Sequence, residues 1–395
     1  MSSEFSAAST NLGYLYQTIY ALLLLLNGRE ETRMSLETLD DVVFEDGDNS
    51  KQLLQLKHHK NSTANLTNNC PDLWKTLRVW SSQILEGNLS LSDTTLTLVT
   101  TAIAPTGSIS ALLKPGSEKD VKDISGQLTQ IAKSSTNQSL EDAFKAFLAL
   151  SISQREELVL AIQILDGSPI IIDLPTKIKN LLLGVRPKYR EHVYERLEGW
   201  WVDLAIRHLF LNSEHMVSKN QVEEKIASIN EQFGPDVLPI DFFDANPPDT
   251  PDLSSDHRQF VMQLKRIMVQ DRRIEKAILD YYRAFQQRSK WMRDNLVDDR
   301  EWESYEAKLI DEWDRFCLAL RDEVDYDDTS DEKCIVIGKK VYNWMEMKAN
   351  FPIRKQVTEE YMIRGSYHLL ADKNPPGVWW HPKFLEELSK ILVIP

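Results

Sequence analysis

The segments SLETLDDVVFE, residues 35–45, and LLQLKHH, residues 53–59, decide the fold of the first part of this chain. Each mixes apolar and polar residues over the length of a short strand. The polar loop EDGDNSKQ, residues 45–52, joins them and contains Asp46-Gly47, a pair that favours a reversal of the chain. The sequence therefore predicts two strands that pair side by side.

Acidic, amide and lysine side chains of these segments are predicted to share one face, because successive side chains on a strand point to opposite faces. Glu37 and Asp41 lie on one face of the first segment. Gln55 and Lys57 lie on one face of the second. Such a patch suits a hard divalent cation, Mg²⁺ or Mn²⁺, and phosphodiester cleavage. A solvated hairpin surface explains the same residues, and both interpretations stay open.

Two further polar side chains could support this patch. Gln17 lies on a leucine-rich helix, where a buried amide needs a partner. It could face the patch, or it could cap the edge of a strand. His59 shares the strand face of Lys57, so contact with a phosphate or a metal is possible, and so is an ordinary surface histidine.

The length of 395 residues indicates two or three domains, and the hydrophobic share of 42% is typical of a globular protein. The longest apolar run, residues 15–26, is too short to cross a bilayer. The start MSSEF has no basic region and is not a signal peptide, so we expect a cytoplasmic protein without membrane contact. Cys70, Cys317 and Cys334 lie far apart and predict neither disulfides nor a zinc site.

The net charge of −14 opposes simple binding to DNA, because proteins that bind DNA usually present a basic surface. DNA binding would need a local basic strip, self-assembly or a DNA-binding partner. The sequence offers one candidate strip, made of Lys51, Lys57, His59, Lys60, Lys75 and Arg78.

The order of predicted elements in the first half is typical of an α/β domain. A helix over residues 9–26 precedes the two strands, and a helix over 71–85 and a strand over 95–102 follow. Residues 107–139 are predicted to be loop-like. Helices are predicted over residues 139–149 and 153–165, the second with a capping box at Ser153 and Glu156, then a short strand over 170–173 and helices to about residue 210.

The second half is predicted to be helical. A linker rich in proline and aspartate spans residues 234–255. One long helix over 256–296 and another over 301–320 are predicted to form an antiparallel pair. The predicted division is a domain over 1–215, a connection with one helix over 216–255 and a helical docking domain over 256–395.

Aromatic and basic residues of the second half allow two interpretations. Eight of the ten tryptophans lie there and could stack on bases or pack in a core: Trp200, Trp201, Trp291, Trp302, Trp313, Trp344, Trp379 and Trp380. Arg283, Arg288, Lys290 and Arg293 could line a groove for a phosphate backbone. They could equally pair with the acidic residues of the next helix.

The first half carries G-Y-L-Y-Q at residues 13–17, E-x-x-x-D at 37–41 and Q-x-K at 55–57. This pattern resembles the double-stranded DNA endonuclease domain of CD-NTase-associated bacterial defence proteins, a PD-(D/E)XK-like domain. The resemblance implies Mg²⁺-dependent cleavage of double-stranded DNA. Implied catalytic residues and metal ligands lie at Glu37, Asp41, Gln55 and Lys57. Gln55 stands where the superfamily often has glutamate, which removes one carboxylate.

The segments at residues 280–296, 305–313 and 364–384 resemble the C-terminal domain of ABC-three-component defence systems. The combined pattern is similar to the nuclease subunit family of Lamassu systems, called LmuA, or DdmA in a plasmid-defence version. The resemblance implies an SMC-like ATPase and a small third subunit as partners. It also implies a nuclease that acts after release from the complex and self-association into tetramers.

Two alternatives remain beside the nuclease effector. The chain could be a non-catalytic scaffold whose nuclease-like fold only mediates assembly. It could also be an adaptor whose helical second half is the functional part. The presence of Glu37, Asp41, Gln55 and Lys57 favours the enzyme.

Overall fold

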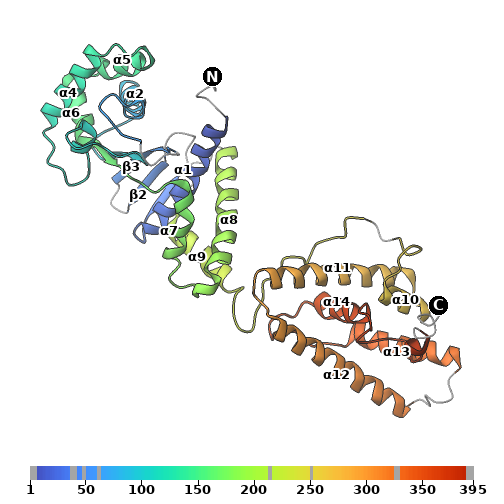
Figure 1. Ribbon diagram of the computed structural model, residues 1–395. Coiled ribbons are helices and arrows are strands. Elements are labelled where there is room, and N and C mark those ends of the chain that lie inside the picture. The colour runs from blue at the N-terminus through green and yellow to red at the C-terminus, as the bar shows by residue number, and fades with distance from the viewer. Residues whose placement is uncertain are drawn as a thin grey trace. The chain divides into compact units, whose positions relative to one another are not determined.

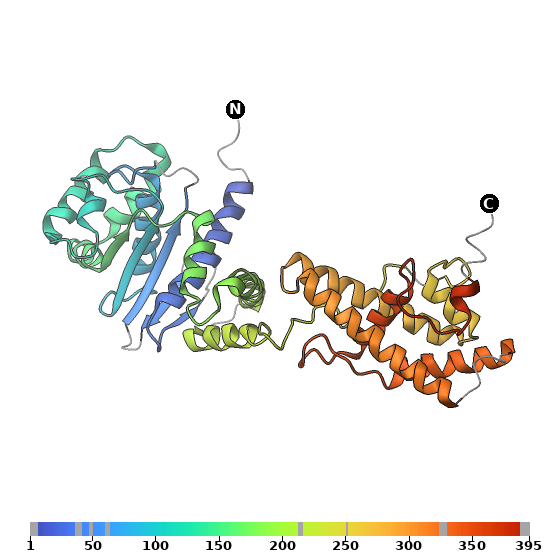
Figure 2. The ribbon, with the colours of Figure 1, turned by 60° about the horizontal axis from the view of Figure 1, so that its bottom comes forward.

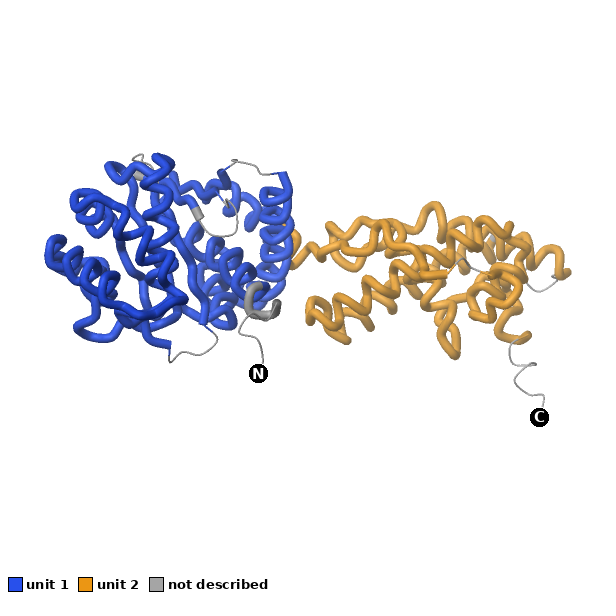
Figure 3. Tube along the Cα trace, turned by 90° about the horizontal axis from the view of Figure 1, so that it is seen from above, with its two compact units in different colours: residues 1–230 blue, residues 231–395 orange. Residues whose placement is uncertain are grey.

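A computed structural model describes residues 7–35, 42–46, 50–59, 64–211, 216–249, 252–323 and 330–387. The chain divides into two compact units, an amino-terminal unit of residues 1–230 and a carboxy-terminal unit of residues 231–395 (Figure 3). The division falls after Asn230, whereas the predicted first domain ended at residue 215. Among the described helices, none combines the length and the apolar character needed to span a bilayer.

The amino-terminal unit is built on a mixed sheet of six strands in the order β5-β4-β3-β2-β1-β6. β3 pairs antiparallel with β2 and parallel with β4, which confirms a mixed α/β unit. The strands are β1 (Arg33–Ser35), β2 (Val42–Asp46), β3 (Ser50–Lys57), β4 (Thr94–Thr100), β5 (Ile162–Leu165) and β6 (Val217–Ser218).

The prediction of one strand over residues 35–45 is wrong. β1 ends at Ser35 and β2 begins at Val42, and the antiparallel pairing of Ser35 with Val43 shows that the chain reverses between them. The predicted pairing of the two segments is confirmed, with Val42 opposite Leu54. Glu37 and Asp41 lie outside the described residues, so their predicted common face stays a prediction.

Helices cover both faces of the sheet (Figures 1 and 2). α1 (Ala7–Asn27), α7 (Leu174–Leu181) and α8 (Arg190–Leu211) lie on one side. The other side carries α2 (Pro71–Leu85), α3 (Ile109–Leu112), α4 (Val121–Ser134), α5 (Glu141–Ala149) and α6 (Ile152–Ala161), and α9 (Lys219–Asn230) follows β6.

The core on the second side forms because α2 has apolar residues at helical spacing. Its Trp74, Leu77 and Trp80 are buried together with Leu96 and Leu98 of β4. Full burial of one such side chain contributes about 2 kcal/mol, so this cluster fixes α2 to the sheet. The predicted bounds of α2 are confirmed.

Several shorter predictions in this unit are wrong. The supposed loop over 107–139 contains α4, which is capped by the Asp120 side chain accepting a hydrogen bond from the backbone of Asp123. The capping box of α6 is made by Ser151 and Gln154, and not by Ser153 and Glu156. Residues 162–165 form β5, and residues 171–173 form a 3₁₀ turn where a strand was predicted.

The carboxy-terminal unit is helical, as predicted. Its helices are α10 (Gln259–Arg266), α11 (Asp271–Arg293), α12 (Asp299–Glu323), α13 (Asp331–Met347) and α14 (Glu360–Ala371). Described residues of the predicted linker, 234–249 and 252–255, form no helix or strand. The prediction of a single long helix over 256–296 is wrong, because the chain leaves helical geometry at Met268, where φ is 56°.

α14 lies between α11 and α12, so these two helices do not form the simple antiparallel pair that was predicted (Figure 1). Gly365 lets α14 approach α11 closely, since a Cβ at this position would overlap the carbonyl oxygen of Asp280 and the Cβ of Ala284. Arg288 pairs with Glu306 at 2.6 Å, which confirms ion pairing between α11 and α12. Of the eight tryptophans in the second half of the sequence, five are buried, which confirms their packing role: Trp201 in the amino-terminal unit, and Trp291, Trp302, Trp313 and Trp380 in this one.

Candidate functional site

Gln55 and Lys57 lie on the same face of β3. In the parallel pairing with β4, Gln55 is opposite Leu98 and Lys57 is opposite Thr100. Leu98 belongs to the core beneath α2, so both side chains are on the α2 side of the sheet. The Gln55 side chain is buried, with 1% exposed, and Lys57 is half-buried near the end of the strand.

Hydrogen bonds to Thr101 fix the end of β3. The backbone N–H of Thr101 donates to the carbonyl oxygen of Lys57 at 3.3 Å. The N–H of His59 donates to the Thr101 hydroxyl oxygen at 2.8 Å. His58 belongs to the opposite side, where its ring lies 4.7 Å from that of Tyr16 on α1. Lys57 and His59 are therefore held on a common side by the alternation of the chain.

His59 reaches the start of α2, where its Nε2 lies 2.6 Å from Oδ2 of Asp72. This hydrogen bond is the main reason why the pKa of His59 is raised above its ordinary value. Burial on its own would raise the pKa of Asp72, but the hydrogen bond and the charges of His59, Lys57 and Lys75 outweigh burial and lower it. Both shifts favour the charged forms of the two side chains.

We expect the His59–Asp72 pair to stabilise the fold within a defined pH window. The raised pKa of His59 means that its contribution is complete below 6.5, the ordinary value, and is lost as pH rises through the raised value. The lowered pKa of Asp72 means that its contribution is complete above 3.8 and is lost as pH falls through the lowered value. Asp72→Asn should therefore reduce the free energy of unfolding most between pH 3.8 and 6.5, by up to about 1 kcal/mol.

Urea unfolding at about pH 5 and about pH 9 measures this window. Asp142→Asn is the control, since it removes the same charge from an exposed position of α5. A difference between wild type and Asp72→Asn that is the same at both pH values would contradict the assignment.

The candidate basic strip is only partly assembled. Lys75 and Arg78 are exposed on α2, and the charges of Lys57 and Lys75 both lower the pKa of Asp72 at the start of that helix. Lys51 lies at the opposite end of β3 and is 3.8 Å from Glu45. Lys60 lies outside the described residues. Three of the six predicted basic residues, Lys57, His59 and Lys75, are thus grouped around Asp72.

Gln17 lies on α1, which covers the opposite face of the sheet from Gln55 and Lys57 (Figure 2). Its side chain is half-buried. The structure therefore does not bring Gln17 onto the face of the candidate site. Its role there stays a prediction.

The described residues supply part of the set of ligands that a metal ion would need. Gln55 offers an amide oxygen, a ligand that suits Mg²⁺, on the face that also carries Lys57. Asp72, the nearby described carboxylate, is engaged by His59. The remaining proposed ligands, Glu37 and Asp41, lie outside the described residues. Of the predicted ligands, the described residues thus include only Gln55, whose amide oxygen is of a type that binds Mg²⁺.

In the carboxy-terminal unit, Asp331, His381 and Glu387 bring their ligand atoms within 4.8 Å of one another. Two contacts argue against a metal there. Arg266 forms ion pairs with both carboxylates. Nδ1 of His381 accepts a hydrogen bond from the backbone of Lys383 at 3.2 Å, which places the imidazole proton on Nε2 and removes its lone pair. This cluster is a structural ion-pair network.

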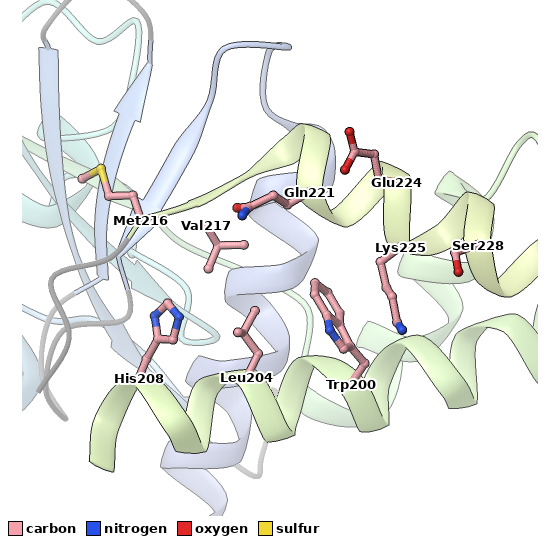
Figure 4. Close-up of a pocket in the computed structure, with 9 residues that line it drawn as sticks. All are labelled: Trp200, Leu204, His208, Met216, Val217, Gln221, Glu224, Lys225 and Ser228. Carbon is pink, nitrogen blue, oxygen red and sulfur yellow. The ribbon is translucent and has the colours of Figure 1, made fainter. Parts of the chain in front are cut away.

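A cleft of about 660 Å³ lies between α8, β6 and α9 (Figure 4). Its apolar walls include Leu204 and Val217, and the ammonium group of Lys225 lies 5.9 Å from the ring centre of Trp200. No sequence motif marks this cleft, because its walls come from separate segments that meet only in the folded chain.

Residues 260–388 match the family model of C-terminal domain 7 of the ABC-three component (ABC-3C) systems. The match covers about a third of the chain and lies wholly within the carboxy-terminal unit. This domain is therefore of a kind that belongs to ABC-three component systems. No curated protein matches the chain.

Solved structures of Cap4 SAVED/CARF-domain containing receptors are also similar to this chain. The Moraxella osloensis structure is 13% identical, with a TM-score of 0.36 over 66% of this chain and 60% of that one. The Acinetobacter baumannii structure is 13% identical, with a TM-score of 0.32 over 65% and 60%. The chain thus spans about 60% of the length of these receptors.

Proposed function

We propose that this chain is a Mg²⁺-dependent double-stranded DNA endonuclease, the LmuA-type effector of a Lamassu complex within the ABC-three component systems. The domain match over residues 260–388 supports membership of such a system. The chemistry rests on one observation: Gln55 and Lys57 share a face at the end of β3, beside the His59–Asp72 pair.

Connectivity supports a role for Asp41 in the same place. Asp41 directly precedes Val42, and Val42 pairs with Leu54, the neighbour of Gln55. We propose Asp41, Glu37 and the Gln55 amide as the residues that hold the cation. When bound, Mg²⁺ would polarise the phosphate and make the attacking water more acidic.

Lys57 would stabilise the transition state. Lys57 is half-buried, and the backbone that carries it is fixed through Thr101, which would limit the reorganisation that its side chain needs. It would orient the attacking water and balance the charge that develops on the phosphate. Lys75 and Arg78, exposed on α2, would bind the DNA backbone on either side without reading its sequence.

Purified chain incubated with supercoiled plasmid and Mg²⁺ tests this proposal, with linear product as the expected result. The net charge of −14 repels DNA, so we propose that assembly supplies the missing attraction by doubling the basic strip. Closed symmetric oligomers, here a tetramer, would also place two sites on opposite strands.

We expect the cleavage rate to rise more than linearly with protein concentration, because only the assembled form would cut both strands. A dilution series of plasmid cleavage, measured beside mass photometry, checks this. The chain bound to its SMC-like ATPase and small third subunit should cleave more slowly at the same concentration. Strictly linear activity from a species that stays monomeric would exclude activation by assembly.

A further inference from the structure

The carboxy-terminal unit has a groove of about 550 Å³ between α12 and α13. We name it the α12–α13 groove. Its main lining residues are Phe316, Leu320, Lys340, Trp344, Met347 and Lys348.

The floor of the α12–α13 groove is aromatic and preformed. The rings of Phe316 and Trp344 stack at 4.6 Å with an angle of 9°. Trp344 also contacts the rings of Phe351 and Tyr367, at 6.2 and 6.1 Å. Rings held in this way from several directions keep their positions, so an incoming group would meet a surface that needs little ordering.

Apolar side chains of the groove are open to solvent. Met347 is 76% exposed at the end of α13, and Phe316 and Trp344 are only half-buried. Exposed apolar groups gathered in one place mark interaction surfaces more often than single exposed residues do. Methionine adapts its shape to different partners, which suits a docking position.

Two lysines give the groove a charge preference. Lys340 is exposed on α13, Lys348 is exposed directly after the end of that helix, and both line the groove. Within the part of the chain that the structure describes, neither lysine has a carboxylate oxygen within 4.0 Å. These positive charges are therefore available to an acidic partner, although the chain as a whole is acidic.

We propose that the α12–α13 groove is a docking site for an amphipathic helix of a partner protein. The apolar face of this helix would cover Phe316, Trp344 and Met347, and its acidic side chains would pair with Lys340 and Lys348. Grooves between helices accept such segments through anchors at i, i+3, i+4 and i+7. The inference rests on the proposed function, because a subunit of the complex would supply the helix.

Aromatic rings and lysines also bind single-stranded nucleic acid, but this groove suits a protein better. The facing surfaces of Phe316 and Trp344 are already stacked on each other, which leaves less ring surface for bases.

Two fluorescent helical peptides of roughly 18 residues, about five helical turns, test the proposal on the full-length chain. Both carry leucines at i, i+3, i+4 and i+7; one has glutamates beside them and the other has lysines. By fluorescence anisotropy, the glutamate peptide should bind about tenfold more tightly. Replacing both groove lysines, Lys340→Glu and Lys348→Glu, should reverse this preference. Met347→Asp should weaken binding of the glutamate peptide about tenfold.

Leu318→Asp is the control, because Leu318 is 49% exposed on α12 but does not line the groove. This variant should bind the glutamate peptide as tightly as the wild-type chain does. Four results would each overturn the proposal. Both peptides could bind equally, or the preference for the glutamate peptide could survive the double lysine replacement. A single-stranded oligonucleotide could bind more tightly than the peptides, or no peptide could bind at about 1 mM. Peptide binding is measured without DNA, so a chain that fails to cleave plasmid still reports on the groove.

Discussion

Lys57→Ala should cleave plasmid at least about 100-fold more slowly than the wild-type chain, which is the usual effect of removing one preorganised electrostatic stabiliser. The loss follows from position, because Lys57 lies at the end of β3, on the face of Gln55 and near the His59–Asp72 pair. The side chain is only half-buried, so its truncation should leave the fold intact. Initial rates of linear product formation, beside circular dichroism, measure both expectations.

Lys51→Ala is the matched control for this variant. Lys51 lies on the same strand and the same face, but at the opposite end of β3, exposed and 3.8 Å from Glu45. The Lys51→Ala variant changes the net charge by the same amount as Lys57→Ala and should cleave plasmid at close to the wild-type rate. Wild-type cleavage by folded Lys57→Ala would refute the catalytic role of Lys57. If neither variant nor wild type cleaved DNA when assembled, the non-catalytic scaffold would explain the chain better.

Deleting residues 231–395 should abolish binding to the SMC-like ATPase and the small third subunit. The deleted unit holds the domain that matches ABC-three component systems and the α12–α13 groove. The amino-terminal unit should stay folded alone, since its sheet and its α2 core lie entirely within residues 1–230. Affinity co-purification of the co-expressed subunits with each form of the chain measures the loss.

Full-length Lys57→Ala serves as the control for the deletion, because it should lose cleavage and keep its partners. Recovery of the partners at full yield with residues 1–230 would disprove docking through the carboxy-terminal unit. A truncated chain that aggregates would instead contradict the independence of the amino-terminal unit.

Long helices and the central strand pairing follow from local patterns, which is why they could be predicted. α2 repeats its apolar residues at helical spacing, and β2 and β3 are joined by a short polar loop. α4 escaped prediction because it lies in a stretch rich in serine, glycine and lysine, residues 107–139, although Ile124 and Leu128 mark a buried face. The break at Met268 has no local signal, since neither glycine nor proline stands there.

Only the part of the candidate site that lies on a single strand could be predicted from the sequence. Alternation along β3 is enough to place Gln55 and Lys57 on a common face. Asp72 was missed, because its contact with His59 depends on where the start of α2 meets the end of β3. The α12–α13 groove was missed for the same reason: Phe316 and Trp344 come together only through packing.

Plasmid cleavage with and without a divalent cation tests the central claim most directly. The purified chain, at concentrations where mass photometry shows assemblies, is incubated with supercoiled plasmid and Mg²⁺, with EDTA, and with EDTA followed by excess Mg²⁺. The metal-dependent mechanism predicts linear DNA in the first reaction, intact plasmid in the second and restored cleavage in the third. Cleavage that persists in EDTA, or intact plasmid in all three reactions, would contradict it.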